Sequence, residues 1–171
     1  MGVRIEGQTR PIRTFWWDRE SRTEADELRA VIFDADSALA RIEHRGPGTD
    51  LVDAVVSLFV AGIWVSVVST RPRSQVEKLV RHILGDGLVE TIVTIDDLTE
   101  PDATLARGGE LYRLALWEMG ITARSALAVT GPDADALAST AAGLPAVVVD
   151  DSLSVASCQQ AHRRWWIRQA A

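Results

Sequence analysis

Short apolar runs alternate with amphipathic segments along most of this chain, and this alternation limits the folds that it can adopt. Each run has the length of a strand and is rich in Val, Ile, Leu or Ala, as expected for a sheet buried on both faces. The segments between the runs repeat apolar residues every three or four positions, as amphipathic helices do. Strands that alternate with helices predict a parallel sheet covered on both faces. The predicted strands span residues 31–34, 63–68, 88–95, 126–129 and 146–149.

Composition and charge narrow the class of protein further. The 171 residues are 47% apolar and 25% charged, which is typical of one globular domain. The net charge of −6 gives no support to nucleic-acid binding. No apolar run approaches the ~18 residues of a membrane span, and the first residues lack the apolar core of a signal peptide. We therefore expect a cytoplasmic protein without nucleic-acid or membrane partners, with an N-terminal extension (1–28) and one core domain (29–171).

Two aspartates, Asp34 and Asp36, stand at the carboxyl end of the first predicted strand. Open α/β proteins bind their ligands at the carboxyl ends of parallel strands. Because alternate residues of an extended segment share a face, both carboxylates can point at one site. Such a pair can supply a nucleophile or metal ligand together with a group that moves a proton. An aspartate before a turn is also common as a cap.

Five motifs along the chain resemble those of one known superfamily, in the same order and with similar spacing. They are Asp34-Ala35-Asp36-Ser37-Ala38, Val67-Val68-Ser69-Thr70-Arg71-Pro72, Asp96-Asp97-Leu98, and the segments 111–121 and 141–149. Together they resemble the haloacid dehalogenase (HAD) superfamily, specifically its phosphoglycolate phosphatase and β-phosphoglucomutase branch. The resemblance implies a three-layer α/β/α Rossmann-like core with a five-stranded parallel sheet. Both places where relatives insert a cap domain are too short here, so we expect none.

The resemblance also implies roles for three of these residues. Asp34 would attack phosphorus to form an aspartyl-phosphate, and Asp36 would act as general acid and base. Ser69 would donate a hydrogen bond to the phosphoryl group, although a hydroxyl at this position is equally consistent with a turn or cap. Mg²⁺ would lie between these anions, with Asp34 and Asp36 among its ligands.

Three parts of the superfamily pattern are altered. The lysine that relatives carry before the 111–121 segment is absent, and Arg107 is the nearest cation that could replace its charge. The acid that usually binds the metal after the fourth strand falls on Gly131, which leaves Asp133 and Asp135 as candidate metal ligands. Ser37 and Ala38 replace Gly-Thr, which predicts the loss of a flexible turn and of a hydroxyl near Asp34.

The sequence therefore leaves two functions open. The first is a HAD-like hydrolase, a Mg²⁺-dependent phosphomonoester phosphatase; its capless site would suit a macromolecular phosphoester or a small substrate closed off by a neighbouring subunit. The alternative is a catalytically degenerate HAD-fold protein that serves as a binding or regulatory module. The acid pair favours the first function, whereas the missing lysine and metal ligand favour the second. A dinucleotide-binding or receiver-like domain is disfavoured, because no Gly-x-Gly-x-x-Gly follows the first strand.

A few residues outside the motifs also carry expectations. Two tryptophan-rich segments, Phe15-Trp16-Trp17 and Trp165-Trp166, are expected to cover edges of the core or to contact a protein partner or second copy. Cys158 is the single cysteine, which excludes an internal disulfide, and its apolar neighbours predict a packed thiol. His162 stands among polar residues, which predicts a surface position.

Overall fold

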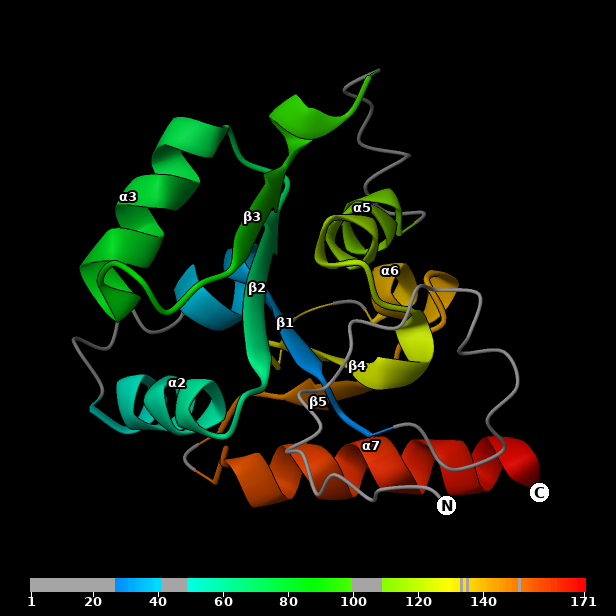
Figure 1. The fold of residues 1–171 in the computed structure, drawn as a ribbon. Coiled ribbons are helices and arrows are strands. Elements are labelled where there is room, and N and C mark those ends of the chain that lie inside the picture. Colours follow the sequence, from blue (N-terminus) through cyan, green and yellow to red (C-terminus); the bar gives the residue numbers. More distant parts are fainter. Residues whose placement is uncertain (1–26, 41–48, 100–108, 133, 135, 151) are drawn as a thin grey trace, which may run out of the picture.

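Five parallel strands form the sheet of this protein, in the order β3-β2-β1-β4-β5 (Figure 1). The computed structural model describes residues 27–40, 49–99, 109–132, 134, 136–150 and 152–171. The strands are β1 (Ala30–Asp34), β2 (Trp64–Ser69), β3 (Thr91–Thr94), β4 (Ala126–Thr130) and β5 (Ala146–Val148). The five-stranded parallel sheet predicted from the sequence is confirmed. Its central strand is β1, which carries the acid pair at its carboxyl end.

Helices cover both faces of this sheet (Figure 1). One layer holds α2 (Thr49–Val60), α3 (Arg73–Leu84) and α7 (Val155–Ala170), and the other holds α5 (Glu110–Met119) and α6 (Leu137–Ala141). The predicted three-layer α/β/α architecture is therefore confirmed. Within the described part of the chain, α3 is the helix that links β2 to β3, and no cap domain is evident. None of the described helices combines the length and apolar character needed to cross a membrane.

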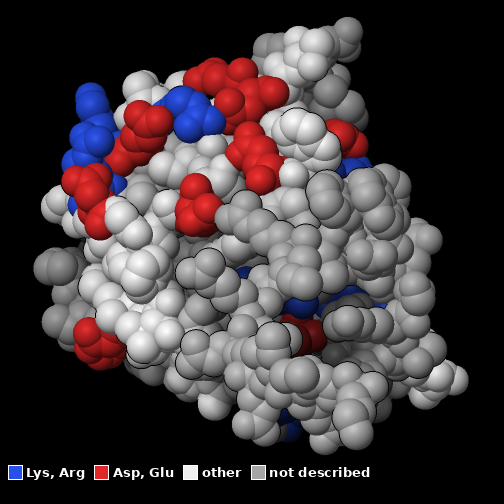
Figure 2. Space-filling model, in the orientation of Figure 1, with Lys and Arg blue, Asp and Glu red and all other residues white. Residues whose placement is uncertain are grey.

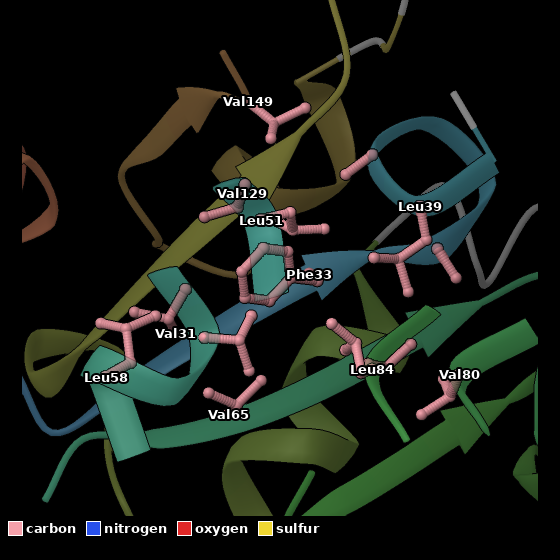
Figure 3. Close-up of a cluster of buried hydrophobic side chains, with 14 of the residues drawn as sticks. Val31, Phe33, Leu39, Leu51, Leu58, Val65, Val80, Leu84, Val129 and Val149 are labelled. Atoms are coloured by element: carbon pink, nitrogen blue, oxygen red, sulfur yellow. The ribbon is translucent and has the colours of Figure 1, made fainter. Parts of the chain in front are cut away.

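Alternate residues of β1 enter two separate cores. Val31 and Phe33 belong to the core shared with α2, α3 and α7, whereas Ile32 belongs to the core shared with α5. Figure 3 shows Phe33 in the middle of the first core, with Leu51 of α2 close to its ring. These β1 side chains are fully buried, which explains why the strand appears in the sequence as a continuous apolar run.

The chain leaves β1 through a tight turn that the sequence did not predict. This turn is the π-helical segment η2 (Ala35–Leu39). Its apolar side is buried, with Ala38 and Leu39 packed into the first core. Packing on this side holds the backbone of η2 against the sheet, and with it the intervening polar residues Asp36 and Ser37. The acid pair therefore stands on a packed segment and not on a free loop.

Two side chains of α7 are fully buried, one apolar and one polar. Cys158 packs into the first core as predicted, and burial raises the pKa of its thiol to about 11. The predicted surface position of His162 is wrong, because its side chain is buried one turn after Cys158 on the same face. Its Nε2 lies 2.6 Å from the carbonyl oxygen of Arg124 and 3.1 Å from the indole nitrogen of Trp166. Trp166 thus packs at the edge of the fold, one of the two alternatives expected for it.

Candidate functional site at the carboxyl ends of the strands

The carboxyl ends of β1, β2 and β4 lie side by side, because β1 pairs in parallel with both of its neighbours. This pairing brings the acid pair of β1 and η2 next to Ser69 at the end of β2 and Gly131 directly after β4. Three predicted site residues, Asp34, Asp36 and Ser69, therefore meet in one place. The predicted cation of the site, Arg107, lies outside the described residues.

The carboxylate of Asp34 caps the first turn of η2. Its Oδ1 accepts a hydrogen bond from the backbone N–H of Asp36 at 3.0 Å, and its Oδ2 accepts one from the hydroxyl of Ser37 at 2.8 Å. Burial raises the pKa of Asp34, the Ser37 hydrogen bond opposes this shift, and the charge of Asp36 adds to it. Both oxygens of the predicted nucleophile thus have a partner within their own turn.

The carboxylate of Asp36 is bound to the end of β2. Its Oδ1 accepts a hydrogen bond from the hydroxyl of Ser69 at 2.5 Å. Its Oδ2 accepts one from the backbone N–H of Thr70 at 2.8 Å and one from the Thr70 hydroxyl at 2.7 Å. The Nε of Arg71 lies 3.7 Å from Oδ1 and adds a positive charge. Asp36 therefore links two strand ends as a hydrogen-bond acceptor.

The Ser69 hydroxyl both donates and accepts a hydrogen bond in the turn that follows β2. Besides donating to Asp36, its Oγ accepts the backbone N–H of Arg71 at 3.0 Å. The side chain is 1% exposed. These are the contacts of a turn residue, and the phosphoryl contact expected of Ser69 stays a prediction.

Ser37 connects η2 to the segment after β4. Its Oγ accepts the backbone N–H of Gly131 at 2.9 Å while donating to Asp34. A Cβ added to Gly131 would lie 2.5 Å from the carbonyl oxygen of Ser37 and 3.0 Å from its Cβ. The sequence predicted the loss of a hydroxyl near Asp34, and this prediction is wrong, because Ser37 reaches back across the turn to supply one. The Asp-x-x-Ser spacing, which suits a helix cap, was the available signal.

The described residues do not fit a Mg²⁺ site. Magnesium requires near-octahedral oxygen ligands, including carboxylate oxygens. Asp34 and Asp36 present their oxygens to N–H and O–H donors of the protein, and Gly131 offers no side chain. Among the residues that the structure describes, no group of three or more His, Cys, Asp or Glu side chains could hold a metal ion. Asp133 and Asp135, the other predicted ligands, lie outside the described residues.

The acidic turn after β3 serves the fold. Asp96 accepts the backbone N–H of Arg73 at 2.8 Å, at the start of α3. Asp97 accepts the Arg73 guanidinium at 2.6 Å and the backbone N–H of Thr94 at 2.7 Å. Figure 2 shows acidic and basic side chains next to one another on the surface over α3 and β3. These acids join β3 to α3.

Tyr112 of α5 is a neighbour of the acid pair that the sequence did not single out. Its side chain is buried in the second core. Burial raises the pKa of its phenol, and the charges of Asp34 and Asp36 raise it further. The phenol is therefore a neutral group within electrostatic reach of both acids. In the sequence, Tyr112 follows the apolar pattern of α5, so it could not be told apart from the core residues around it.

Solved structures that resemble this protein include a β-phosphoglucomutase, CbbY and a HAD-superfamily hydrolase. β-Phosphoglucomutase from Clostridium difficile matches 82% of this chain and 100% of its own, with a TM-score of 0.60 and 10% identity. CbbY from Rhodobacter sphaeroides, solved in complex with phosphate, matches 75% of this chain and 88% of its own, with a TM-score of 0.56 and 16% identity. A HAD-superfamily hydrolase of subfamily IA from Geobacter sulfurreducens matches 71% and 86%, with a TM-score of 0.51 and 20% identity.

No protein-family model matches the sequence, and the comparison with curated proteins found no match. These structural likenesses show that the chain has the α/β core fold of HAD-superfamily proteins. The resemblance seen in the sequence motifs is thereby confirmed at the level of the fold.

Proposed function

We propose that this chain is a catalytically degenerate HAD-fold protein that serves as a binding or regulatory module. The observation that carries the proposal is the position of the Asp36 carboxylate. A general acid must deliver a proton to the leaving group, so its carboxyl must be free to reach that group. Both carboxylate oxygens of Asp36 instead accept hydrogen bonds from Ser69 and Thr70, and the guanidinium of Arg71 lies nearby.

The magnitude of the expected loss supports this proposal. Removing one preorganised electrostatic contact from an active site lowers turnover by roughly 10²–10³-fold. Here the general acid is engaged elsewhere, and Gly131 stands at the position that the resemblance assigns to a metal-binding acid. Two such losses together would lower turnover by roughly 10⁴–10⁶-fold. A protein with this site would do its work by binding.

The tryptophan-rich segments near the two ends of the chain are the candidate contacts for a partner of such a module. Trp166 is already engaged with His162 and lies under the guanidinium of Arg124, whose Cζ is 5.3 Å from the ring centroid. The Phe15–Trp17 segment lies outside the described residues. We therefore place the candidate contact for a protein partner or a second copy in that N-terminal segment.

The second candidate is the hydrolase that the resemblance implies. The observation that favours it is the retained acid pair at the carboxyl end of the central strand. Asp34 would be its nucleophile and Asp36 its acid and base, acting on a phosphorylated substrate. Because the described residues do not fit Mg²⁺, this function would need Asp133 and Asp135 to hold the ion and Arg107 to supply the missing positive charge.

A phosphatase assay separates the two candidates. Turnover of p-nitrophenyl phosphate would be measured with and without Mg²⁺ for the wild type, for Asp34→Asn and for Asp86→Asn. Asp86 is an exposed acid paired with Arg81, far in sequence from the site, and serves as the matched control. We expect all three proteins to remain at the background rate. Mg²⁺-dependent turnover that Asp34→Asn abolishes and Asp86→Asn retains would establish the hydrolase.

A further inference from the structure

We infer that the Ser37 hydroxyl takes the place of a divalent cation in this chain and joins Asp34 to the segment after β4 without a metal. This contact, Asp34 Oδ2–Ser37 Oγ–Gly131 N, is called the Ser37 bridge below. The inference rests on the proposed function, because both concern the same site. The experiment for the inference measures how Mg²⁺ affects the Tm, whereas the experiment for the proposed function measures phosphatase turnover.

The chemistry of the bridge suits a hydroxyl and excludes a cation in the same position. A serine hydroxyl donates one hydrogen bond and also accepts, so one atom can satisfy an anion on one side and an N–H on the other. Ser37 Oγ lies 2.8 Å from Asp34 Oδ2 and 2.9 Å from the backbone nitrogen of Gly131. A metal ion there would meet the Gly131 N–H, which is a donor and offers no lone pair.

The departures from the superfamily pattern at positions 37 and 131 compensate each other. A side chain at position 131 would meet the backbone of Ser37, since an added Cβ lies 2.5 Å from its carbonyl oxygen and 2.7 Å from its carbonyl carbon. The absence of a side chain at Gly131 lets β4 approach η2 closely enough for the bridge to form. The hydroxyl at position 37 then gives both the Gly131 N–H and the Asp34 carboxylate a partner. An acid at 131 and a bridge at 37 are mutually exclusive in this arrangement.

The rest of η2 holds the bridge in position. Ala38 and Leu39, which directly follow Ser37, are fully buried in the first core. Their packing fixes the backbone from which the Ser37 side chain extends. The Asp36 N–H also binds the same carboxylate, through its other oxygen. The geometry is therefore set by covalent connection and core packing, with no ion needed to assemble it.

Thermal unfolding of the full chain tests the bridge. The Tm of the wild type would be followed while MgCl₂ is added, against NaCl of equal ionic strength. We expect the two salts to give the same Tm. Ser37→Ala should lower the Tm by roughly 3–9 °C, because it leaves the Asp34 oxygen and the Gly131 N–H without their partner. Ser37→Thr keeps a hydroxyl and should recover most of this loss.

Ser57→Ala is the matched control. Its hydroxyl donates to the carbonyl oxygen of Asp53 within α2, on an exposed face, so its loss should hardly change the Tm. A saturable rise of the wild-type Tm that is specific to Mg²⁺ would overturn the inference, as would Ser37→Ala unfolding at the wild-type temperature. If Ser37→Ala does not fold, the wild-type titration and the Ser37→Thr variant still decide.

The outcomes distinguish this inference from the proposed function. Phosphatase turnover without any effect of Mg²⁺ would contradict the proposed function and leave the Ser37 bridge intact. A Mg²⁺-specific rise in Tm without turnover would remove the bridge and leave the binding module. Mg²⁺-specific stabilisation together with Mg²⁺-dependent turnover would remove both.

Discussion

Replacing Gly131 with alanine is expected to lower the free energy of unfolding by about 2–4 kcal/mol. The new Cβ would lie 2.5 Å and 2.7 Å from two backbone atoms of Ser37, which cannot move aside as a flexible side chain could. The segment after β4 must therefore shift, and the hydrogen bond from Gly131 to Ser37 is lost. Chemical denaturation followed by circular dichroism would measure the change.

Gly120→Ala is the control for this substitution. Gly120 has a φ of 64°, and nothing lies within 4 Å of an added Cβ. Alanine there meets only the backbone strain of the left-handed region, about 1 kcal/mol. Gly131 is not among the glycines with positive φ, so its cost comes from the close approach alone. Equal losses for the two variants would contradict the geometry described for the Ser37 bridge.

Asp36→Ala is the second substitution with a large expected effect, a loss of about 2–4 kcal/mol in the free energy of unfolding. It removes the acceptor for the Ser69 hydroxyl and for both donors of Thr70. The Ser69 hydroxyl is buried, so it cannot turn to bulk water for a new acceptor. Equilibrium denaturation in urea would measure the loss.

The sign of this effect separates a structural acid from a catalytic one. Residues kept for catalysis commonly cost stability, so removing them tends to leave a protein unchanged or more stable. Asp86→Ala provides the comparison, because its carboxylate forms an exposed ion pair with Arg81 at 3.2 Å and should contribute little. An Asp36→Ala protein as stable as Asp86→Ala would show that Asp36 does not hold β1 to β2.

Most of the fold could be predicted because the three central strands, β2, β1 and β4, are buried on both faces. Each strand then appears as an apolar run, and the order of runs and helices leaves few topologies. The extent of β3 was the weakest part of the prediction. Leu88 and Val89 pack against the core without joining the ladder, whose paired residues begin at Thr91. An apolar run indicates which residues are buried. It does not indicate which of them pair with a neighbouring strand, because pairing depends on residues elsewhere in the chain.

The location of the site could also be predicted, but its internal contacts could not. Asp34, Asp36 and Ser69 meet because strand ends in a parallel sheet meet. The partners of Asp36 lie 33 and 34 residues away, and Ser37 and Gly131 are 94 residues apart. Such contacts depend on side-chain rotamers and on the distance between loops. The paired departures at positions 37 and 131 were the only trace of them in the sequence.

Site-resolved Mg²⁺ binding is the measurement that tests the central claim most directly. In a nitrogen–proton correlation NMR spectrum, the Gly131 amide signal reports on one end of the Ser37 bridge, and the Asp36 amide signal reports on the Asp34 carboxylate through its other oxygen. MgCl₂ would be added to the wild-type protein up to millimolar concentration, with NaCl as the reference. If the protein's own groups supply the hydrogen-bond partners of Asp34, Asp36 and Gly131, the chemical shifts of these two amides do not change when MgCl₂ is added. A saturable, Mg²⁺-specific shift centred on Asp36 and Gly131 would contradict it.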